Sequence, residues 1–298
     1  MENYLGELAA LGTSLSFSFG SIMFTIAGRE LGSMNVNRTR LVIAAILLAS
    51  VHLLTFGSIF PFDAAPERLF WLGISGVVGL VIGDIFLFQA LVLIGPRLSM
   101  LMMSLAPIMA AIMAWIFLGE RLSGGKIAGI LLTVGGIAWV ILEKKGHGES
   151  DREYGRGILL GLFGAIGQAA GFVLAKNGVG GEFSAISANL IRMTSAVIAI
   201  WLLTLFQGQA KKTISTFFSN RKGMLATSGG AFAGPFLGVS LSLFALQRVE
   251  VGVASTLTAL PPIFLLPISY FVFKERFGWG AVVGTLVAMA GVAALFLV

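Results

Sequence analysis

Residues 95–121 read GPRLSMLMMSLAPIMAAIMAWIFLGER, a largely apolar run with Arg97 near one end and a Glu-Arg pair at the other. Roughly 20 residues at a rise of about 1.5 Å each cross a hydrocarbon core of about 30 Å, so we predict one membrane-spanning helix with Pro107 near its middle. The same plan recurs 155 positions later, where residues 250–276 read EVGVASTLTALPPIFLLPISYFVFKER. This recurrence indicates two related halves.

The same register holds well beyond this helix. It aligns Pro107 with Pro262, and it aligns the Glu-Arg pair at 120–121 with the same pair at 275–276. It also aligns glycines, namely Gly79 with Gly234, Gly83 with Gly238, Gly125 with Gly280, Gly129 with Gly284 and Gly136 with Gly291. Chance would not keep these residue types in one register over so long a stretch. The sequence therefore predicts an internal duplication.

The composition places nearly the whole chain in a membrane. Its 298 residues are 57% hydrophobic and 11% charged, with a mean hydropathy of +0.94, whereas soluble domains carry about 25% charged residues. We predict an all-α integral membrane protein with ten transmembrane helices, at residues 4–27, 39–56, 70–93, 98–117, 125–142, 157–176, 185–206, 223–247, 252–273 and 279–298. Because little chain is left for a soluble domain, a functional site must lie inside the bundle.

The predicted helices divide into two five-helix repeats, residues 1–142 and 157–298, joined by a polar linker at 143–156. An odd number of helices per half makes the second half enter the membrane from the opposite side, so the repeats are predicted to be inverted. Inverted repeats place substrate sites near the membrane midplane at the repeat interface. This organisation predicts a transporter that works by alternating access.

Basic residues give one prediction of orientation. The net charge of +6 is expected in loops, among them a basic, water-facing loop around residues 211–222. The loops on the linker's face hold 13 basic residues, including Arg38 and Arg97, against 5 on the opposite face. The positive-inside rule then places the linker in the cytoplasm and both termini outside.

Asp84 is the acidic residue that lies well within a predicted helix. A carboxylate there costs about 2.5–3.5 kcal/mol on insertion scales, so it should face a cavity or a partner. Such carboxylates often belong to proton relays, which makes protons a candidate coupling ion; the alternative is a structural aspartate near a helix end. Gln89 and Gln168 lie in apolar surroundings and are candidate cavity donors.

Pro107 and Pro262 interrupt the backbone hydrogen bonds of equivalent helices, because proline has no donor and clashes with the carbonyl four residues earlier. In lipid the freed carbonyl needs another partner, and Ser104 and Thr258 are close enough in sequence to provide one. A hinge that lines the substrate cavity is one interpretation, and a kink that only improves packing is the other.

Arg40 and Arg192 occupy matching places near the starts of the second and seventh predicted helices, each four residues before an alanine. They are candidates for gating or anion contact, and Arg192 is the deeper of the two; snorkelling to lipid headgroups is the alternative. One helix also carries several methionines that form either an adaptable apolar cavity wall or plain core, namely Met100, Met102, Met103, Met109 and Met113.

Taken together, these features resemble the EamA family of the drug/metabolite transporter superfamily. The resemblance rests on two five-helix halves that carry an alanine, a proline and a glutamate at one and the same spacing, namely Ala90, Pro107 and Glu120 in the first half and Ala245, Pro262 and Glu275 in the second. It implies a ten-helix secondary carrier in the cell (inner) membrane, often an exporter of amino acids or other small metabolites. It also implies a cavity lined by the third, fourth, eighth and ninth helices, with Asp84, Gln89, Ser104 and Thr258 on them.

The resemblance further implies that both termini lie in the cytoplasm, which conflicts with the charge count, so orientation stays open. The expected partners are the lipid bilayer and a small-molecule substrate, with no nucleic acid, and the chain is expected as a monomer or weak homodimer. An amphipathic metabolite such as an amino acid suits both the arginines and the apolar wall. A multidrug or lipid-precursor exporter is the alternative.

Other function classes find little support in the sequence. The chain has no cysteine and two histidines, too few for a clustered metal site, so we expect no metal and no cofactor. Intramembrane aspartyl proteolysis needs two carboxylates that share a proton, and a scaffold would need more extramembrane surface. Without a GxxxxGK[ST] motif, transport should run on gradients.

Overall fold

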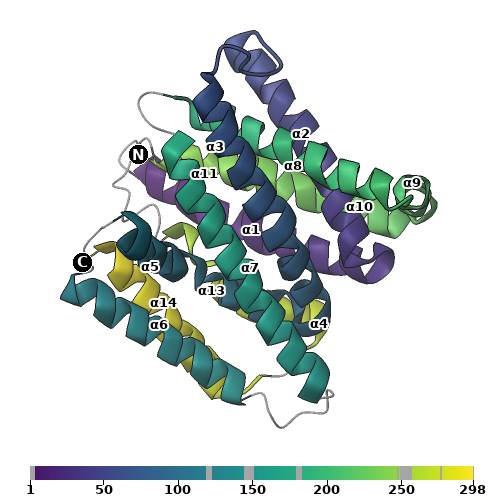
Figure 1. The fold of residues 1–298 in the computed structure, drawn as a ribbon. Coiled ribbons are helices and arrows are strands. Elements are labelled where there is room, and N and C mark those ends of the chain that lie inside the picture. Colours follow the sequence, from purple (N-terminus) through teal and green to yellow (C-terminus); the bar gives the residue numbers. More distant parts are fainter. Residues whose placement is uncertain are drawn as a thin grey trace.

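The computed structural model describes residues 4–118, 123–143, 151–178, 183–246, 248, 257–275 and 277–297. Within these ranges every regular element is a helix (Figure 1). In chain order they are α1 Leu5–Leu31, α2 Ser33–Phe56, α3 Pro66–Gly76, the π-helix η2 Val77–Gly83, α4 Asp84–Met103, α5 Ala106–Leu118, α6 Gly124–Glu143, α7 Asp151–Gly178, α8 Ala185–Phe206, α9 Ala210–Ser219, α10 Arg221–Ala231, the π-helix η3 Phe232–Gly238, α11 Val239–Leu246, α13 Pro261–Phe273 and α14 Trp279–Leu297.

Eight helical stretches of the described chain are long and apolar enough to cross a membrane. One of them, Pro66–Met103, joins α3, η2 and α4, and another, Arg221–Ser242, joins α10, η3 and the start of α11. The fourth and ninth predicted spans instead contain the shorter helices α5 and α13, of 13 residues each. The all-helical, membrane-spanning class therefore agrees with the prediction.

The prediction of one continuous helix across residues 95–121 is wrong. The chain turns at Gly95, whose φ of 76° and ψ of 171° are not helical, and the helix breaks again at Ser104 and Leu105. Pro107 then lies in the first turn of α5, where its missing N–H costs nothing because the first turn has no intrahelical acceptor. Pro262 has the same place in α13. These prolines begin new helices instead of kinking existing ones.

The internal repeat is visible in the bounds of the helices. Helices α3 and α10 begin at residues 66 and 221 and end at 76 and 231, an offset of 155 throughout. The same offset relates the bounds of η2 to those of η3 and the bounds of α5 to those of α13. Even the π-helices recur at equivalent positions, so the two halves share local backbone geometry as well as sequence.

Each half packs its first helix against the π-helix of the other half. A Cβ on Gly20 of α1 would lie 3.2 Å from the backbone nitrogen of Gly234 in η3, and a Cβ on Gly171 of α7 would lie 3.1 Å from that of Gly79 in η2. Backbones this close leave no room for a side chain, which is the usual role of small residues between membrane helices. The two halves therefore pack closely against each other through their first helices.

The last helices of the halves, α6 and α14, lie side by side (Figure 1). A Cβ on Gly129 would lie 2.8 Å from the carbonyl oxygen of Gly291, and a Cβ on Gly136 would lie 2.6 Å from that of Gly284. As the residue number rises along α6, the residue number of the contacting glycine falls along α14, so the two helices run antiparallel. Because the repeat register equates Gly129 with Gly284 and Gly136 with Gly291, the two contacts are equivalent.

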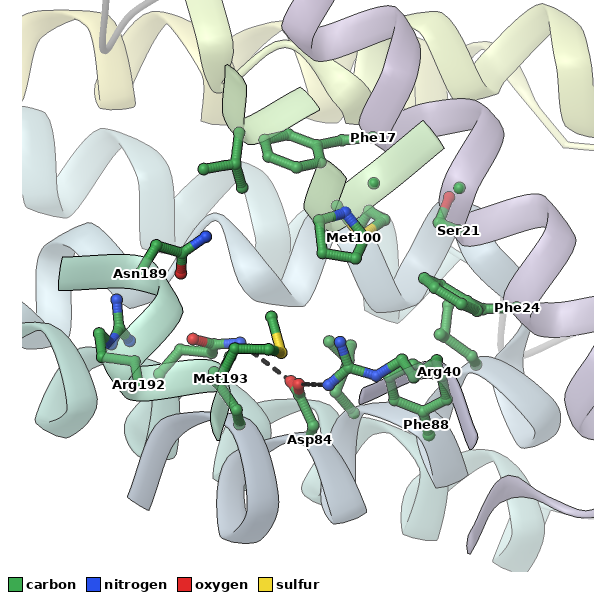
Figure 2. Close-up of a pocket in the computed structure, with 18 of the residues that line it drawn as sticks. Phe17, Ser21, Phe24, Arg40, Asp84, Phe88, Met100, Asn189, Arg192 and Met193 are labelled. Carbon is green, nitrogen blue, oxygen red and sulfur yellow. Dashed lines mark hydrogen bonds and ion pairs between the residues drawn. The ribbon is translucent and has the colours of Figure 1, made fainter. Parts of the chain in front are cut away.

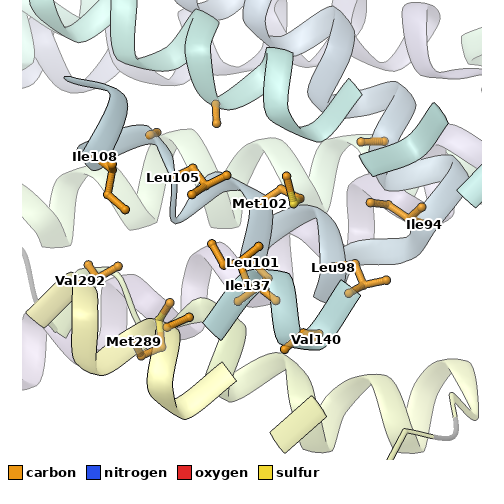
Figure 3. Packing of buried hydrophobic residues seen from close by; sticks show 14 of the residues in the cluster. Ile94, Leu98, Leu101, Met102, Leu105, Ile108, Ile137, Val140, Met289 and Val292 are labelled. Atoms are coloured by element: carbon orange, nitrogen blue, oxygen red, sulfur yellow. The ribbon is translucent and has the colours of Figure 1, made fainter. Parts of the chain in front are cut away.

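Helices α6 and α14 also complete the largest hydrophobic core, shown in Figure 3. Residues of α4 and α5 that follow the Gly95 turn pack there against both helices. The labelled members of this cluster are Ile94, Leu98, Leu101, Met102, Leu105, Ile108, Ile137, Val140, Met289 and Val292. The turn at Gly95 therefore directs the chain from the region of α1 and α2 into this core.

Two segments predicted as loop or linker contain helix. The basic stretch expected as a water-facing loop forms α9 and the start of α10, because buried Arg38 bonds to residues in and before α9. The expected linker 143–156 overlaps α6 at its first residue and α7 from Asp151 onward; its residues 144–150 lie outside the described part of the chain. Glu120, Arg121 and Arg276 of the repeated motif lie outside it as well.

Candidate functional site

A cavity of about 240 Å³ lies where the two halves meet (Figure 2). Its wall comes from α1, α2, η2 and α4 of the first half and from α7, α8, η3 and α11 of the second. The charged lining residues are Arg40, Asp84 and Arg192, with Gln168 and Asn189 as polar neighbours. Most other lining residues are apolar, including Phe17, Phe24, Leu80, Leu87, Phe88, Leu91, Met100, Phe172, Met193, Pro235 and Val239. The site is a small apolar cavity with a few charged groups.

Asp84 is the centre of a buried hydrogen-bond network. Arg40 donates from Nη2 to Asp84 Oδ2 as an ion pair, and Gln168 donates from Nε2 to Asp84 Oδ1 at 2.9 Å. The exposed fraction of the Asp84 and Arg40 side chains is 4% and 5%. A buried charge needs both a counter-ion and hydrogen bonds, and Asp84 has both, so this network joins three helices, α2, α4 and α7.

Arg40 is held by further contacts on α1, α2 and α4. Its Nε donates to Asn37 Oδ1 at 3.0 Å, and its guanidinium lies 4.7 Å from the ring centroid of Phe88 and 5.8 Å from that of Phe24. Cations over aromatic faces gain additional electrostatic stabilisation. Arg40 is therefore fixed in place instead of snorkelling to the lipid headgroups.

The π-helix η2 and α7 together bring Asp84 and Gln168 into contact. Asp84 is the first residue after η2, and π-helical turns frequently occur at functional sites. A Cβ on Gly83 would lie 3.1 Å from the backbone nitrogen of Gln168. Because Gly83 has no side chain, α7 approaches closely enough for Gln168 to reach the carboxylate.

Arg192 and Asn189 are bound much less completely than Arg40. Arg192 lies over Phe172, with its Cζ 5.4 Å from the ring centroid. Within the described ranges, however, Arg192 Nε and Asn189 Nδ2 are both buried without a hydrogen-bond partner. Figure 2 shows both residues on one side of Asp84 and Arg40 on the other. The cavity thus contains unused hydrogen-bond donors.

The other predicted site residues lie away from this cavity. Gln89 accepts a 2.6 Å hydrogen bond from Ser33 at the start of α2. Ser104 donates to the carbonyl of Met100 at 3.4 Å and, with Pro107, lies at the α4–α5 break. Thr258 and Pro262 lie at the equivalent place before and in α13. The structure thus brings together Asp84, Gln168, Arg40 and Arg192 from the predicted set, and none of the others lines this cavity.

The lining also differs from the one that the family resemblance implies. Among described residues it includes Met100 from the fourth predicted helix, none from the ninth, and several from the first two helices of each half. The residues that orient the arginines were not predicted from the sequence, namely Asn37, Phe88 and Phe172. Asn37 lies three residues before Arg40 on the same helix, a spacing that places two side chains on one face. The two phenylalanines lie on other helices than their arginines, so the sequence carries no signal for their role.

A second ion pair joins the halves outside the cavity. Arg97 Nε donates to Glu275 Oε2 at 3.3 Å, and the Arg97 guanidinium lies 4.9 Å from the ring centroid of Phe277. Arg97 was expected in a loop, but its exposed fraction is 3%. The left-handed turn at Gly95 explains its burial, since the turn directs the following residues into the bundle.

Other proteins share this arrangement of helices. In total, 27 chains of solved structures match the fold. One of them, titled "Crystal structure of protein", has a TM-score of 0.63 and 17% sequence identity over 98% of this chain and 96% of that one; at this identity the likeness concerns the fold alone. No curated protein matches the sequence. The family model described as "EamA-like transporter family" matches twice, over residues 4–142 and 155–297. Since the two matches span nearly the whole chain, this multi-pass membrane protein belongs to the EamA-like transporter family, within the drug/metabolite transporter superfamily.

Proposed function

We propose that this chain is a secondary transporter that exports small metabolites such as amino acids through the cavity between its halves. The observation that carries the proposal is the placement of Arg40, Asp84 and Arg192 in an apolar cavity built from both halves. Ionisable residues inside a membrane protein typically mark substrate or ion pathways. Charged groups beside aromatic and methionine side chains suit a solute with one polar end and one apolar end.

The size of the cavity favours a small metabolite over a drug. Pockets for drug-sized ligands typically enclose about 300–1,000 Å³, and this one encloses about 240 Å³. The multidrug and lipid-precursor alternatives would favour a cavity within or above that range. The lack of a nucleotide-binding motif supports a gradient as the energy source, with protons as the candidate coupling ion at Asp84.

Alternating access would come from two inverted five-helix repeats, residues 1–142 and 157–298, in the cell (inner) membrane. Support comes from the constant offset between the bounds of equivalent helices and from the antiparallel contact of α6 and α14. A further support is that the first helix of each half packs against the π-helix of the other half. In this arrangement the broken segments ending in α5 and α13 act as the fourth and ninth of ten spans. The proposed cavity lies between units that can rock against each other.

Counterflow in proteoliposomes tests the proposal. Vesicles containing the purified protein would be loaded with a pool of amino acids and mixed with labelled ones, with and without an imposed pH gradient. Asp84→Asn keeps the shape of the side chain, and the matched control Asp63→Asn removes an exposed carboxylate outside the cavity.

The expected result is amino-acid flux that the pH gradient stimulates in wild type and Asp63→Asn but not in Asp84→Asn. Equal flux in all three proteins would remove Asp84 from coupling and indicate facilitated exchange. No flux of any amino acid, together with flux of drugs or lipid precursors, would contradict the proposed substrate class.

A further inference from the structure

We infer that Arg192 and Asn189 form the subsite that receives the anionic group of the substrate, and that this group is a carboxylate. The inference rests on the proposed function of the cavity. It adds the residues that bind the substrate's charged end and the sign of that charge.

The hydrogen-bonding capacity of the cavity favours a ligand with acceptor atoms. Both oxygens of Asp84 accept hydrogen bonds, one from Arg40 and one from Gln168. Arg40 is further occupied by Asn37. What remains buried and unpartnered on the described lining is Arg192 Nε and Asn189 Nδ2, and both are N–H donors. The ligand atoms that lie beside these two donors are therefore acceptors.

The net charge of the cavity favours an anion. The described lining has two arginines and one aspartate, which leaves one positive charge in an apolar cavity. A buried charge without a counter-ion is strongly unfavourable. A carboxylate beside Arg192 would give this arginine a counter-ion, whereas a cationic group there would add a second unpaired charge.

The positions of the two donors suit a carboxylate. Asn189 and Arg192 are three positions apart on α8, so they occupy the same face of that helix, and Figure 2 shows them together on one side of the cavity. Phe172 holds the Arg192 guanidinium by its ring face. Adjacent donors with one net positive charge match the two oxygens of a carboxylate, and a phosphate monoester would bring more charge than the cavity balances.

The test uses thermal unfolding of the purified full chain in detergent, followed by tryptophan fluorescence at constant ionic strength. The probes are 4-methylpentanoate, its neutral amide 4-methylpentanamide, and inorganic phosphate. A ligand that binds only the folded state raises the unfolding temperature in a saturable way. We expect saturable stabilisation by the carboxylate, with an apparent affinity at least ~10-fold higher than for the amide.

Variants locate the binding to the proposed subsite. Arg192→Gln and Asn189→Asp should each weaken carboxylate binding by at least ~10-fold, the second because it places a negative charge beside Arg192. The matched control Lys211→Gln removes one positive charge from exposed α9 and should bind like wild type. Because Arg192→Gln could fold poorly, Arg192→Lys is included, and it should retain measurable but weaker binding.

Equal stabilisation by acid and amide would overturn the inference, and this comparison needs only the wild-type protein. Preferential binding of phosphate, or unchanged carboxylate binding in Arg192→Gln, would overturn it as well. The transport proposal is tested separately by flux. Carboxylate binding without flux would support the subsite and contradict the transport proposal, whereas flux of neutral solutes without carboxylate binding would do the reverse.

Discussion

Arg40 is hydrogen-bonded to Asp84, whereas Arg192, its counterpart 152 positions later, keeps a buried Nε without a partner in the described chain. Both arginines line one cavity and each is stacked on an aromatic ring. The described lining thus holds two arginines from matching helices and one acidic residue, Asp84, whose repeat equivalent is Val239. This asymmetry separates a structural arginine from one that is available to a ligand.

The first prediction concerns stability. Arg40→Gln should lower the unfolding temperature much more than Arg192→Gln, because it leaves Asp84 buried without its counter-ion. Breaking such a pair costs about 3–5 kcal/mol. Arg192→Gln loses one cation–π contact, worth about 0.5–2 kcal/mol, and this loss is offset because the substitution also removes a buried charge that has no counter-ion of its own. Thermal unfolding in detergent without ligand measures both. Equal losses in the two variants would show that the ion pair does not stabilise the fold.

The second prediction concerns the contact between the halves and uses adjacent glycines on α6. A Cβ at Gly136 would lie 2.6 Å from the Gly284 carbonyl, whereas a Cβ at Gly135 would meet nothing within 4 Å. Gly136→Ala should therefore destabilise the protein by separating α6 from α14. Gly135→Ala should be neutral or should stabilise the helix by about 0.5–1 kcal/mol. A reversed order of the unfolding temperatures would contradict the packing described for these helices.

The third prediction concerns the attachment of α9. Arg38 donates to Gln209 at 3.0 Å, to Thr213 at 2.9 Å and to Gln207 at 2.9 Å. Arg38→Met should release α9 and speed trypsin cleavage after Lys211 and Lys212 several-fold, because cleavage requires local unfolding. Limited proteolysis followed by mass spectrometry measures the rate.

The control for this experiment is Arg152→Met, which removes an exposed arginine from α7 and should leave cleavage in α9 unchanged. If Arg38→Met and the control are cleaved at the same rate, α9 is held by contacts other than those of Arg38.

The duplication could be predicted from the sequence because its signals are local and repeated. Glycine and proline impose backbone geometry wherever they occur, so their repeated register reappears in the bounds of the helices. The cavity residues Asp84, Gln168, Arg40 and Arg192 were also found, since polar groups are expensive in lipid and stand out in an apolar sequence.

Other features left no readable signal in the sequence. Apolar residues occur on all sides of these helices, so periodicity cannot distinguish the π-helical turns of Val77–Gly83 from α-helix. Arg38 and Arg97 were predicted to lie in loops, but both are buried, and their burial depends on partners far along the chain, such as Gln209 and Glu275. Gln89 was predicted to line the cavity, but it accepts a hydrogen bond from Ser33 and is not among the described lining residues. Contacts between distant segments decided the cases of Arg38, Arg97 and Gln89.

The central claim, that the cavity is the transport pathway, has a direct test because the chain contains no cysteine. Val239→Cys places a single thiol on the cavity lining, and Ile46→Cys places one on α2 at a position that is 61% exposed. Counterflow would be measured before and after treatment with a maleimide. We predict that the reagent blocks flux in Val239→Cys, that substrate protects against the block, and that Ile46→Cys is unaffected. Full flux through a quantitatively labelled Val239→Cys protein would contradict the claim.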